Sequence, residues 1–156
     1  MSDFILDLAT LKPTLNRVEI ETPAAEVGLP GAEWRGSIRA SLRVEKTGER
    51  VSVRGDVSSV VQLECVRCLR AFELEISAPF TTYADRKGKS SAAEEDALER
   101  DDYMLFHDGR RMDLRESVRE TLLLELPITP RCREDCLGLC PTCGADLNLG
   151  PCAHAR

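Results

Sequence analysis

The cysteines constrain this chain more than any other residues do. There are seven of them, and they fall in two blocks far apart in the sequence. With the one histidine close to them, the candidate ligands are Cys65, Cys68, Cys132, Cys136, Cys140, Cys143, Cys152 and His154. Seven thiolates and one imidazole make eight ligands, the number that two tetrahedral Zn²⁺ sites require. We therefore predict two structural zinc sites with no ligand left over.

A disulfide explanation for these cysteines fits the sequence poorly. The first residues carry acids at Asp3 and Asp7 and no apolar run as long as a signal peptide, so we expect a cytoplasmic protein. Thiols stay reduced in that compartment. Redox catalysis is the competing explanation, but the sequence lacks the βαβ setting of a thioredoxin-like C-x-x-C. We interpret the cysteines as zinc ligands and keep a zinc-dependent thiol enzyme or redox sensor as an alternative.

The spacing allows two divisions of the ligands between two ions. The favoured division puts Cys65, Cys68, Cys132 and Cys136 on one zinc and Cys140, Cys143, Cys152 and His154 on the other. In the rival division the two C-x2-C pairs share one ion, as in a zinc ribbon, and the other four residues form the second site. The sharpest local signal is Cys-Pro-Thr-Cys-Gly at 140–144. There the proline fixes a turn, and the glycine permits positive φ, so that N–H groups can approach the sulfurs.

Alternating apolar and polar residues fill the middle of the chain, at 34–44, 51–65 and 72–80. This period of two predicts three antiparallel strands, with an irregularity near 58–60 and the first C-x2-C at the tip of the second hairpin. Further alternation at 4–8 and at Val18 and Ile20 predicts two more short strands, whose pairing partners the sequence does not identify.

The region after the predicted sheet contains a loop, a hairpin and a helix. Residues 85–102 are charged and rich in Gly and Ser, which predicts a mobile loop, and 103–114 are predicted to form a hairpin on an Asp-Gly turn. A helix is expected over 113–126, capped by Asp113 with Glu116 completing a capping box. Its apolar stripe consists of Leu114, Val118, Leu122 and Leu126. The predicted fold class is α+β: an antiparallel sheet, curled toward a barrel, packed by one main helix and followed by a zinc-stapled C-terminal tail.

Length and charge limit the organisation and the partners. With 156 residues there is room for one core, so we expect a core domain at 1–131 and a cysteine-rich zinc-binding tail at 132–156. The net charge of -6 opposes generic attraction to a phosphate backbone. If RNA is contacted directly, Arg35, Arg39 and Arg43 are the candidates, because alternation places them on one exposed strand face. Ordinary solubilising charges explain these arginines more simply.

An enzyme is not predicted. Each proposed zinc site is saturated by protein ligands, so neither keeps the open position that a catalytic water needs. His107, the only other histidine, is expected to be a solvated residue beside the Asp-Gly turn rather than a base. The sequence has no Gly-rich phosphate loop or nucleophile-elbow motif. We expect no catalytic residue, no small-molecule substrate and no membrane partner.

Three segments together resemble the YceD family, described as large ribosomal RNA subunit accumulation proteins. They are Cys65-Val66-Arg67-Cys68-Leu69 with Phe72, Glu120 through Pro127 with Pro130, and Asp135 through Gly144 with Leu147-Asn148. The resemblance implies a non-enzymatic factor for the accumulation of 23S ribosomal RNA and large-subunit assembly. The implied partner is the large-subunit precursor, reached through a basic ribosomal protein, an assembly factor or the RNA. A general zinc-ribbon nucleic-acid binder is a further alternative.

Overall fold

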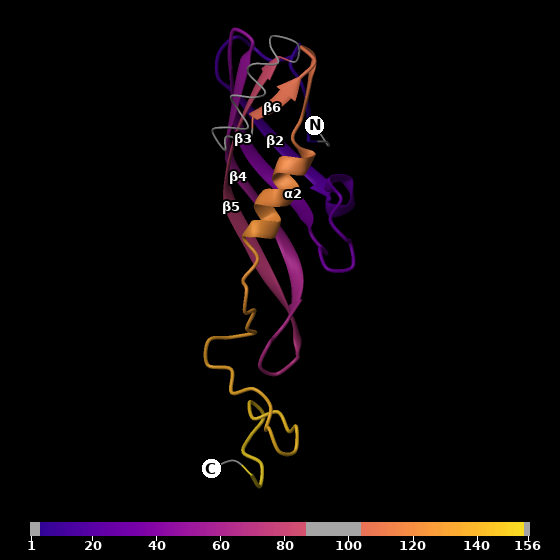
Figure 1. Cartoon of the computed structure of the whole chain (residues 1–156), viewed down its shortest axis with the longest axis vertical. Coiled ribbons are helices and arrows are strands. Elements are labelled where there is room, and N and C mark those ends of the chain that lie inside the picture. Colours follow the sequence, from indigo (N-terminus) through magenta and orange to yellow (C-terminus); the bar gives the residue numbers. More distant parts are fainter. Residues whose placement is uncertain (1–3, 87–103, 155–156) are drawn as a thin grey trace.

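The computed structural model describes residues 4–86 and 104–154. The elements are β1 (Ile5–Asp7), β2 (Asn16–Pro23), the 3-10 helix η1 (Ala24–Val27), β3 (Ser37–Thr47), β4 (Arg50–Glu64), β5 (Ala71–Arg86), β6 (Met104–His107), β7 (Arg111–Asp113) and α2 (Arg115–Leu124). Figure 1 shows an elongated molecule with the sheet and α2 at one end and the cysteine-rich tail at the other. No helix in the described ranges is long and apolar enough to cross a membrane.

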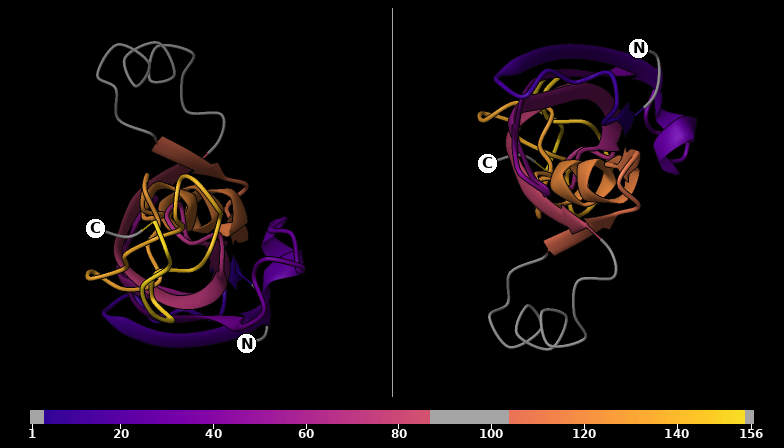
Figure 2. Two further views of the ribbon diagram at one scale, coloured as in Figure 1. Left: turned by 90° about the horizontal axis from the view of Figure 1, so that it is seen from below. Right: turned by 90° about the horizontal axis from the view of Figure 1, so that it is seen from above.

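Most of the strands belong to one sheet, in the order β2-β3-β4-β5-β6, while β1 pairs with β7 in a second sheet. All pairs are antiparallel except β5 with β6. The larger sheet curves around α2 without closing (Figure 2). The expected curl toward a barrel therefore stops short of closure within the described residues. The helix packs on β5, η1 and β4 and lies on the concave side of the sheet.

The long strands confirm the three predicted antiparallel strands, because buried and exposed side chains alternate along them. The irregularity predicted at 58–60 is wrong, since the register of β4 with β5 is unbroken over its whole length. Ser59 occupies a core position of this regular strand, and its hydroxyl donates to the Ser37 carbonyl at 3.4 Å. Trp34 lies before β3 rather than in it, yet it is buried.

Strands β3 and β4 approach each other very closely at Gly55, which faces Leu42 in the register. A Cβ added to Gly55 would overlap the carbonyl oxygen of Ser41 and stand 2.9 Å from Cα of Leu42. Both obstacles are backbone atoms of a strand paired on both sides, so neither can move aside cheaply. Only glycine fits this point of the curved sheet.

The β4–β5 hairpin reaches beyond the rest of the sheet. Strand β4 pairs with β3 only as far as Ser58, but it pairs with β5 as far as Glu64. The remaining part is a two-stranded ribbon that points toward the tail (Figure 1). The turn at 65–70 closes this ribbon, which confirms the predicted position of the first C-x2-C at a hairpin tip.

The predicted hairpin over 103–114 is wrong, because its two strands join different sheets. Strand β6 pairs in parallel with β5, and β7 pairs with β1, which also settles the partner of the N-terminal strand. Between them, the carboxylate of Asp108 accepts the N–H groups of Arg111 and Arg110, and these bonds lower the pKa of Asp108. The predicted loop lies outside the described residues from residue 87 onward, while Asp85 and Arg86 belong to β5.

His107 is buried, which corrects the expectation of a solvated histidine. Its Nε2 lies 2.7 Å from the carbonyl oxygen of Glu49, and the N–H of Gly109 donates to its Nδ1 at 3.0 Å. These contacts fit a neutral ring with its proton on Nε2. His107 therefore joins β6 to the β3–β4 turn, a structural task.

The predicted apolar stripe is confirmed at Leu114, Val118 and Leu122, which are fully buried on the sheet. The helix is shorter than the predicted 113–126, since α2 ends at Leu124 and the fourth member of the stripe, Leu126, lies beyond it and is only partly buried. The predicted capping box is wrong. The residue at the N-cap position is Leu114, and Asp113 instead accepts the N–H of Arg115 and ion-pairs with its guanidinium. Glu116 pairs with Arg119, one turn further along the helix, at 2.6 Å. The helix thus begins with charge pairs rather than with a reciprocal cap.

Candidate metal centres

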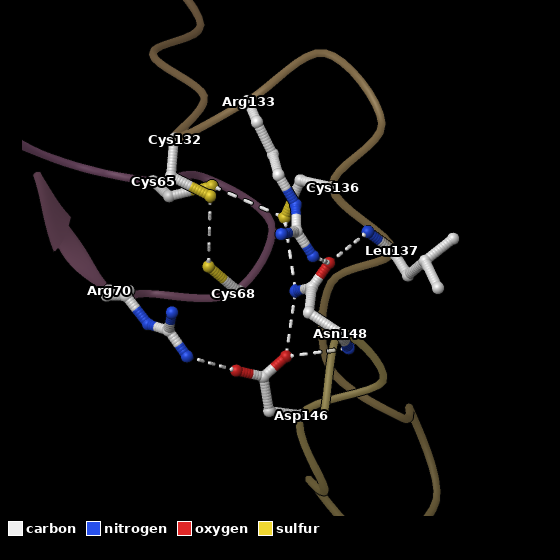
Figure 3. A network of polar contacts seen from close by, with 9 residues as sticks. All are labelled: Cys65, Cys68, Arg70, Cys132, Arg133, Cys136, Leu137, Asp146 and Asn148. Carbon is white, nitrogen blue, oxygen red and sulfur yellow. Dashed lines mark hydrogen bonds and ion pairs between the residues drawn. The ribbon is translucent and has the colours of Figure 1, made fainter. Parts of the chain in front are cut away.

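The first candidate site is built on a tight turn at the tip of the β4–β5 ribbon. The N–H of Leu69 donates to the carbonyl of Cys65 at 2.9 Å, and the N–H of Cys65 donates to the carbonyl of Arg70 at 2.9 Å. Leu69 adopts φ 57° and is the one non-glycine with positive φ among the described residues. The turn brings the sulfurs of Cys65 and Cys68 together at the same end of the ribbon (Figure 3).

The tail repeats this turn with the same hydrogen bonds. The N–H of Gly144 donates to the carbonyl of Cys140 at 2.8 Å, and the N–H of Cys140 donates to the carbonyl of Ala145 at 2.8 Å. Gly144 has φ 72° and takes the place that Leu69 holds in the first turn. We call the two turns, at 65–70 and 140–145, the first and second knuckle.

All eight predicted ligands lie together in two groups. The proximal cluster is Cys65, Cys68, Cys132 and Cys136, and the distal cluster is Cys140, Cys143, Cys152 and His154. Within each cluster the candidate ligand atoms lie within 4.8 Å of one another. This grouping is the one favoured from the spacing, and it puts the two knuckles in different clusters. That metal ions bind there stays a prediction.

The sulfur positions fit a tetrahedral ion better than a disulfide. Sγ of Cys65 lies 3.8 Å from Sγ of Cys136, and Sγ of Cys68 lies 3.7 Å from Sγ of Cys132 (Figure 3). A tetrahedron with Zn–S bonds of about 2.3 Å has edges of about 3.8 Å. Bonded sulfurs would be only about 2.05 Å apart. The proximal cluster therefore has the dimensions of a Cys₄ zinc site.

The two clusters differ in exposure. In the proximal cluster Cys65 and Cys136 are fully buried, and the sulfurs form a small apolar group of their own with Phe72. In the distal cluster Cys143 and His154 are exposed. The distal ligands are thus less shielded from solvent than the proximal ones.

Backbone N–H groups favour the thiolate form of the first cysteine in each knuckle. The N–H of Cys68 lowers the pKa of Cys65 to about 6, and the N–H of Cys143 lowers the pKa of Cys140 to about 7. Burial, in contrast, raises the pKa of Cys132 to about 12. Thiolates this close disfavour one another, so a cation must be present for four of them to ionise together.

Sequence reasoning missed the side chains that fasten the tail to the first knuckle. Arg67 donates to the carbonyl of Cys136 at 2.8 Å, and Arg70 pairs with Asp146 at 3.0 Å. The amide of Asn148 donates to Sγ of Cys136 at 3.4 Å (Figure 3). The available signal was the Asp-x-Asn pattern at 146–148, because such residues form turns through their side chains.

Two of the three arginines proposed for RNA contact, Arg39 and Arg43, share the exposed face of β3 as predicted, but Arg35 lies outside the strand. Arg35 precedes β3, and Arg39 pairs with a glutamate of β5 at 3.7 Å. Arg43 instead lies directly between Arg17 of β2 and Arg54 of β4 in the register. Acids occupy neighbouring outward positions on the same strands, so this row is not a broad basic patch.

Together, the fold and the site define a class of protein: an antiparallel α+β domain whose hairpin tip meets a cysteine-rich tail in two candidate metal clusters. The pattern of the family described as "Large ribosomal RNA subunit accumulation protein YceD" matches residues 53–156. The chain belongs to the YceD family, which confirms the resemblance. The matched region begins in β4 and includes both clusters.

The chain is also similar to individual proteins of two mycobacteria and of maize, and the maize protein carries the family description in its name. An uncharacterized protein of Mycobacterium leprae is 35% identical over 150 residues, which cover 94% of this chain and 63% of the relative. An uncharacterized protein of Mycobacterium tuberculosis is 35% identical over 113 residues, covering 70% of this chain and 51% of the relative. A Zea mays protein named "Large ribosomal RNA subunit accumulation protein YCED homolog 1, chloroplastic" is 28% identical over 155 residues, covering 80% and 53%. The chain thus spans between half and two thirds of these relatives, and no solved structure matches it.

Proposed function

We propose that this chain is a non-enzymatic ribosome biogenesis factor of the cytoplasm that supports 23S rRNA accumulation and assembly of the large subunit. Membership of the YceD family carries the proposal, because the family description names the accumulation of large-subunit ribosomal RNA. The maize relative bears the same words in its name. The division into a core at 1–131 and a zinc-binding tail at 132–156 is part of the proposal.

Two structural Zn²⁺ ions are the second part of the proposal. The sulfur separations of the proximal cluster support it, and so does the fact that the two clusters use all seven cysteines. Each cluster offers four protein ligands, so an ion would have no open position for a substrate or a catalytic water. Native mass spectrometry with elemental analysis should find two zinc ions per chain. A folded chain that contains neither zinc nor iron would contradict this part.

The proposed partner is a precursor of the large ribosomal subunit. The net charge of -6 favours contact through a basic ribosomal protein or an assembly factor. Direct RNA contact would be centred on Arg43, because its neighbours in the register, Arg17 and Arg54, are also cationic. Arg39 already has an acidic partner and serves as the matched control.

The test is depletion of the protein in cells, followed by complementation. We expect the ratio of 23S to 16S rRNA to fall on depletion and the protein to sediment with large-subunit precursors. Complementation with Arg43→Glu and with Arg39→Glu then separates RNA contact from protein contact, since only the former should depend on Arg43. An unchanged ratio together with sedimentation as a free protein would refute the proposal.

A zinc-dependent thiol redox sensor or enzyme remains the second candidate, because Cys143 is exposed at the surface of the distal cluster. A mild alkylating agent separates the two functions. Structural zinc should protect all seven thiols in the metal-loaded protein. Rapid labelling of Cys143 in the metal-loaded protein would favour the sensor.

A general nucleic-acid binder is tested separately. Tight, salt-sensitive binding to RNA of arbitrary sequence would favour that function.

A further inference from the structure

Asn148 lies in the loop between two distal ligands, but its side chain contacts a ligand of the proximal cluster. It lies in residues 144–151, the loop enclosed by the distal ligands Cys143 and Cys152. Its side-chain amide, however, reaches the proximal cluster and donates to Sγ of Cys136 at 3.4 Å (Figure 3). A single side chain therefore connects the loop of one candidate metal site to a ligand of the other.

The amide of Asn148 uses its full hydrogen-bonding capacity. Besides the bond to Cys136, its Nδ2 donates to Asp146 at 2.7 Å, and its Oδ1 accepts the N–H of Leu137 and the guanidinium of Arg133, both at 2.8 Å. Two donors and two acceptors are all that an asparagine side chain offers. The orientation of the amide is thereby fixed, with one N–H group held against the sulfur.

Backbone contacts hold the distal loop against the proximal segment. Leu139 forms a β-bridge with Asp146, and the N–H of Leu147 donates to the carbonyl of Gly138 at 2.9 Å. Asp146 also pairs with Arg70, the last residue of the first knuckle. When residues 144–151 are closed against the proximal segment, the Asn148 amide lies against Cys136. When they open, this contact is lost.

Hydrogen bonds to ligand atoms normally orient metal ligands and tune their affinity. An N–H group aimed at Sγ of Cys136 stabilises the thiolate and holds the sulfur in its binding position. The neighbouring bonds to Leu137 and Arg133 hold the backbone on either side of that ligand. Loss of such outer partners typically lowers metal affinity about 10- to 100-fold.

We propose that Asn148 is a positioning residue through which metal binding at the distal cluster strengthens metal binding at the proximal cluster. The inference rests on the zinc part of the proposed function and adds cooperativity to it. An ion held by the distal ligands closes residues 144–151 and sets the Asn148 amide against Cys136. Coupling between two binding equilibria is reciprocal, so proximal binding strengthens distal binding by the same factor.

The experiment is a double-mutant cycle on the full chain. Cys152→Ser with His154→Ala empties the distal cluster, and Asn148→Ala removes the connecting amide. Zinc affinity is measured by competition with a chelator of known affinity. Cobalt substitution assigns each binding step, because a Cys₄ site and a Cys₃His site have different absorption spectra.

Two further variants guard against a trivial loss of structure. Asn148→Asp keeps both acceptor bonds but replaces the N–H groups with oxygen, so at nearly constant shape it removes the donor bonds to Cys136 and Asp146 together and adds a negative charge. Asn16→Ala is the matched control, because the Asn16 amide fastens a loop through its bonds to Lys12 and Thr14 instead. Fluorescence of Trp34, the single tryptophan and a buried one, reports whether the sheet remains folded.

We expect emptying the distal cluster to weaken proximal zinc binding about 10- to 100-fold, with a similar loss for Asn148→Ala and for Asn148→Asp. Combining the emptied distal cluster with Asn148→Ala should weaken proximal zinc binding by less than about twofold beyond either change alone. Asn16→Ala should bind zinc at the proximal cluster as tightly as the unmutated chain does. Proximal affinity that ignores the distal cluster, or an Asn148→Asp variant with full affinity, would overturn the coupling while leaving both zinc sites standing. A chain that binds no metal would overturn the coupling together with the zinc proposal.

Discussion

Two glycines of the tail make a matched pair that measures how firmly the tail is docked on the first knuckle. Gly138 has φ 75° and Gly144 has φ 72°, so an alanine is equally strained at either position. A Cβ at Gly144 meets nothing within 4 Å, whereas a Cβ at Gly138 stands 3.1 Å from the carbonyl oxygen of Arg67. That oxygen also accepts the N–H of Leu139 at 3.2 Å, so the new methyl group would push directly on the docking contact.

The two substitutions therefore share one energy term and differ in another. An alanine with positive φ costs about 1 to 2 kcal/mol, and the less flexible unfolded chain returns about 0.4 to 1 kcal/mol. Gly144→Ala should carry this net cost alone. Gly138→Ala adds crowding against backbone, which typically costs about 1 to 3 kcal/mol. This difference corresponds to about 5- to 150-fold in zinc affinity at the proximal cluster.

The assay is chelator competition on the metal-loaded protein, with the cobalt spectrum assigning the proximal step. Gly138→Ala should lose proximal affinity, while Gly144→Ala should keep most of it. Trp34 fluorescence should be unchanged in both, because Trp34 belongs to the core of the sheet. Equal affinity in the two variants would show that the contact between Gly138 and Arg67 does not hold the tail, and the reasoning would fail.

The remaining predictions concern the core. Gly55→Ala should unfold the sheet or lower its melting temperature severely, because the new Cβ overlaps backbone, whereas Gly31→Ala, with nothing within 4 Å, should melt normally in a thermal scan. His107→Leu should lower the free energy of unfolding, measured by urea titration, by about 1 to 3 kcal/mol. The buried carbonyl of Glu49 and the N–H of Gly109 would each lose a hydrogen bond to the ring. A hydrogen bond from the guanidinium of Arg115 lowers the pKa of Asp113 in the folded chain. The stability that this pair contributes is therefore present above the unfolded pKa of about 3.9 and is lost as the pH falls from there through the lower folded pKa. Asp113→Asn should therefore flatten the fall in stability between pH 5 and 3, measured in EDTA, and an unchanged profile would count against this pair.

Features encoded in neighbouring residues were predictable from the sequence. Alternation located the three long strands, the spacing of Leu114, Val118 and Leu122 located the buried face of the helix, and the C-x2-C at residue 65 lies at the expected hairpin tip. The two groups of candidate ligands are also those favoured from the spacing, although the proximal group joins two pairs that are 64 residues apart, which local spacing alone left open. That these groups bind zinc stays a prediction.

Features that depend on distant backbone were not predictable from local patterns. The Asp-Gly sequence at residue 108 suggested a hairpin, but β6 and β7 each found a more distant strand to pair with. Ser59 looked like a break in a strand, since nothing local shows that the carbonyl of Ser37 accepts its hydroxyl. His107 looked solvated because the carbonyl that covers it comes from another turn. Leu69 in the first knuckle was missed because glycine is the usual signal for positive φ.

The proximal cluster is divided between a hairpin tip and the tail, so its two halves are synthesised at different times. Cys68 and its neighbour Cys132 are 64 residues apart, and every strand and helix of the described fold is encoded before Cys132. A nascent chain can therefore complete its sheet while the tip still presents two unclaimed thiols. An ion that needs all four proximal ligands could be held only after Cys132 and Cys136 have been synthesised, so the order of synthesis puts folding of the sheet before closure of this site.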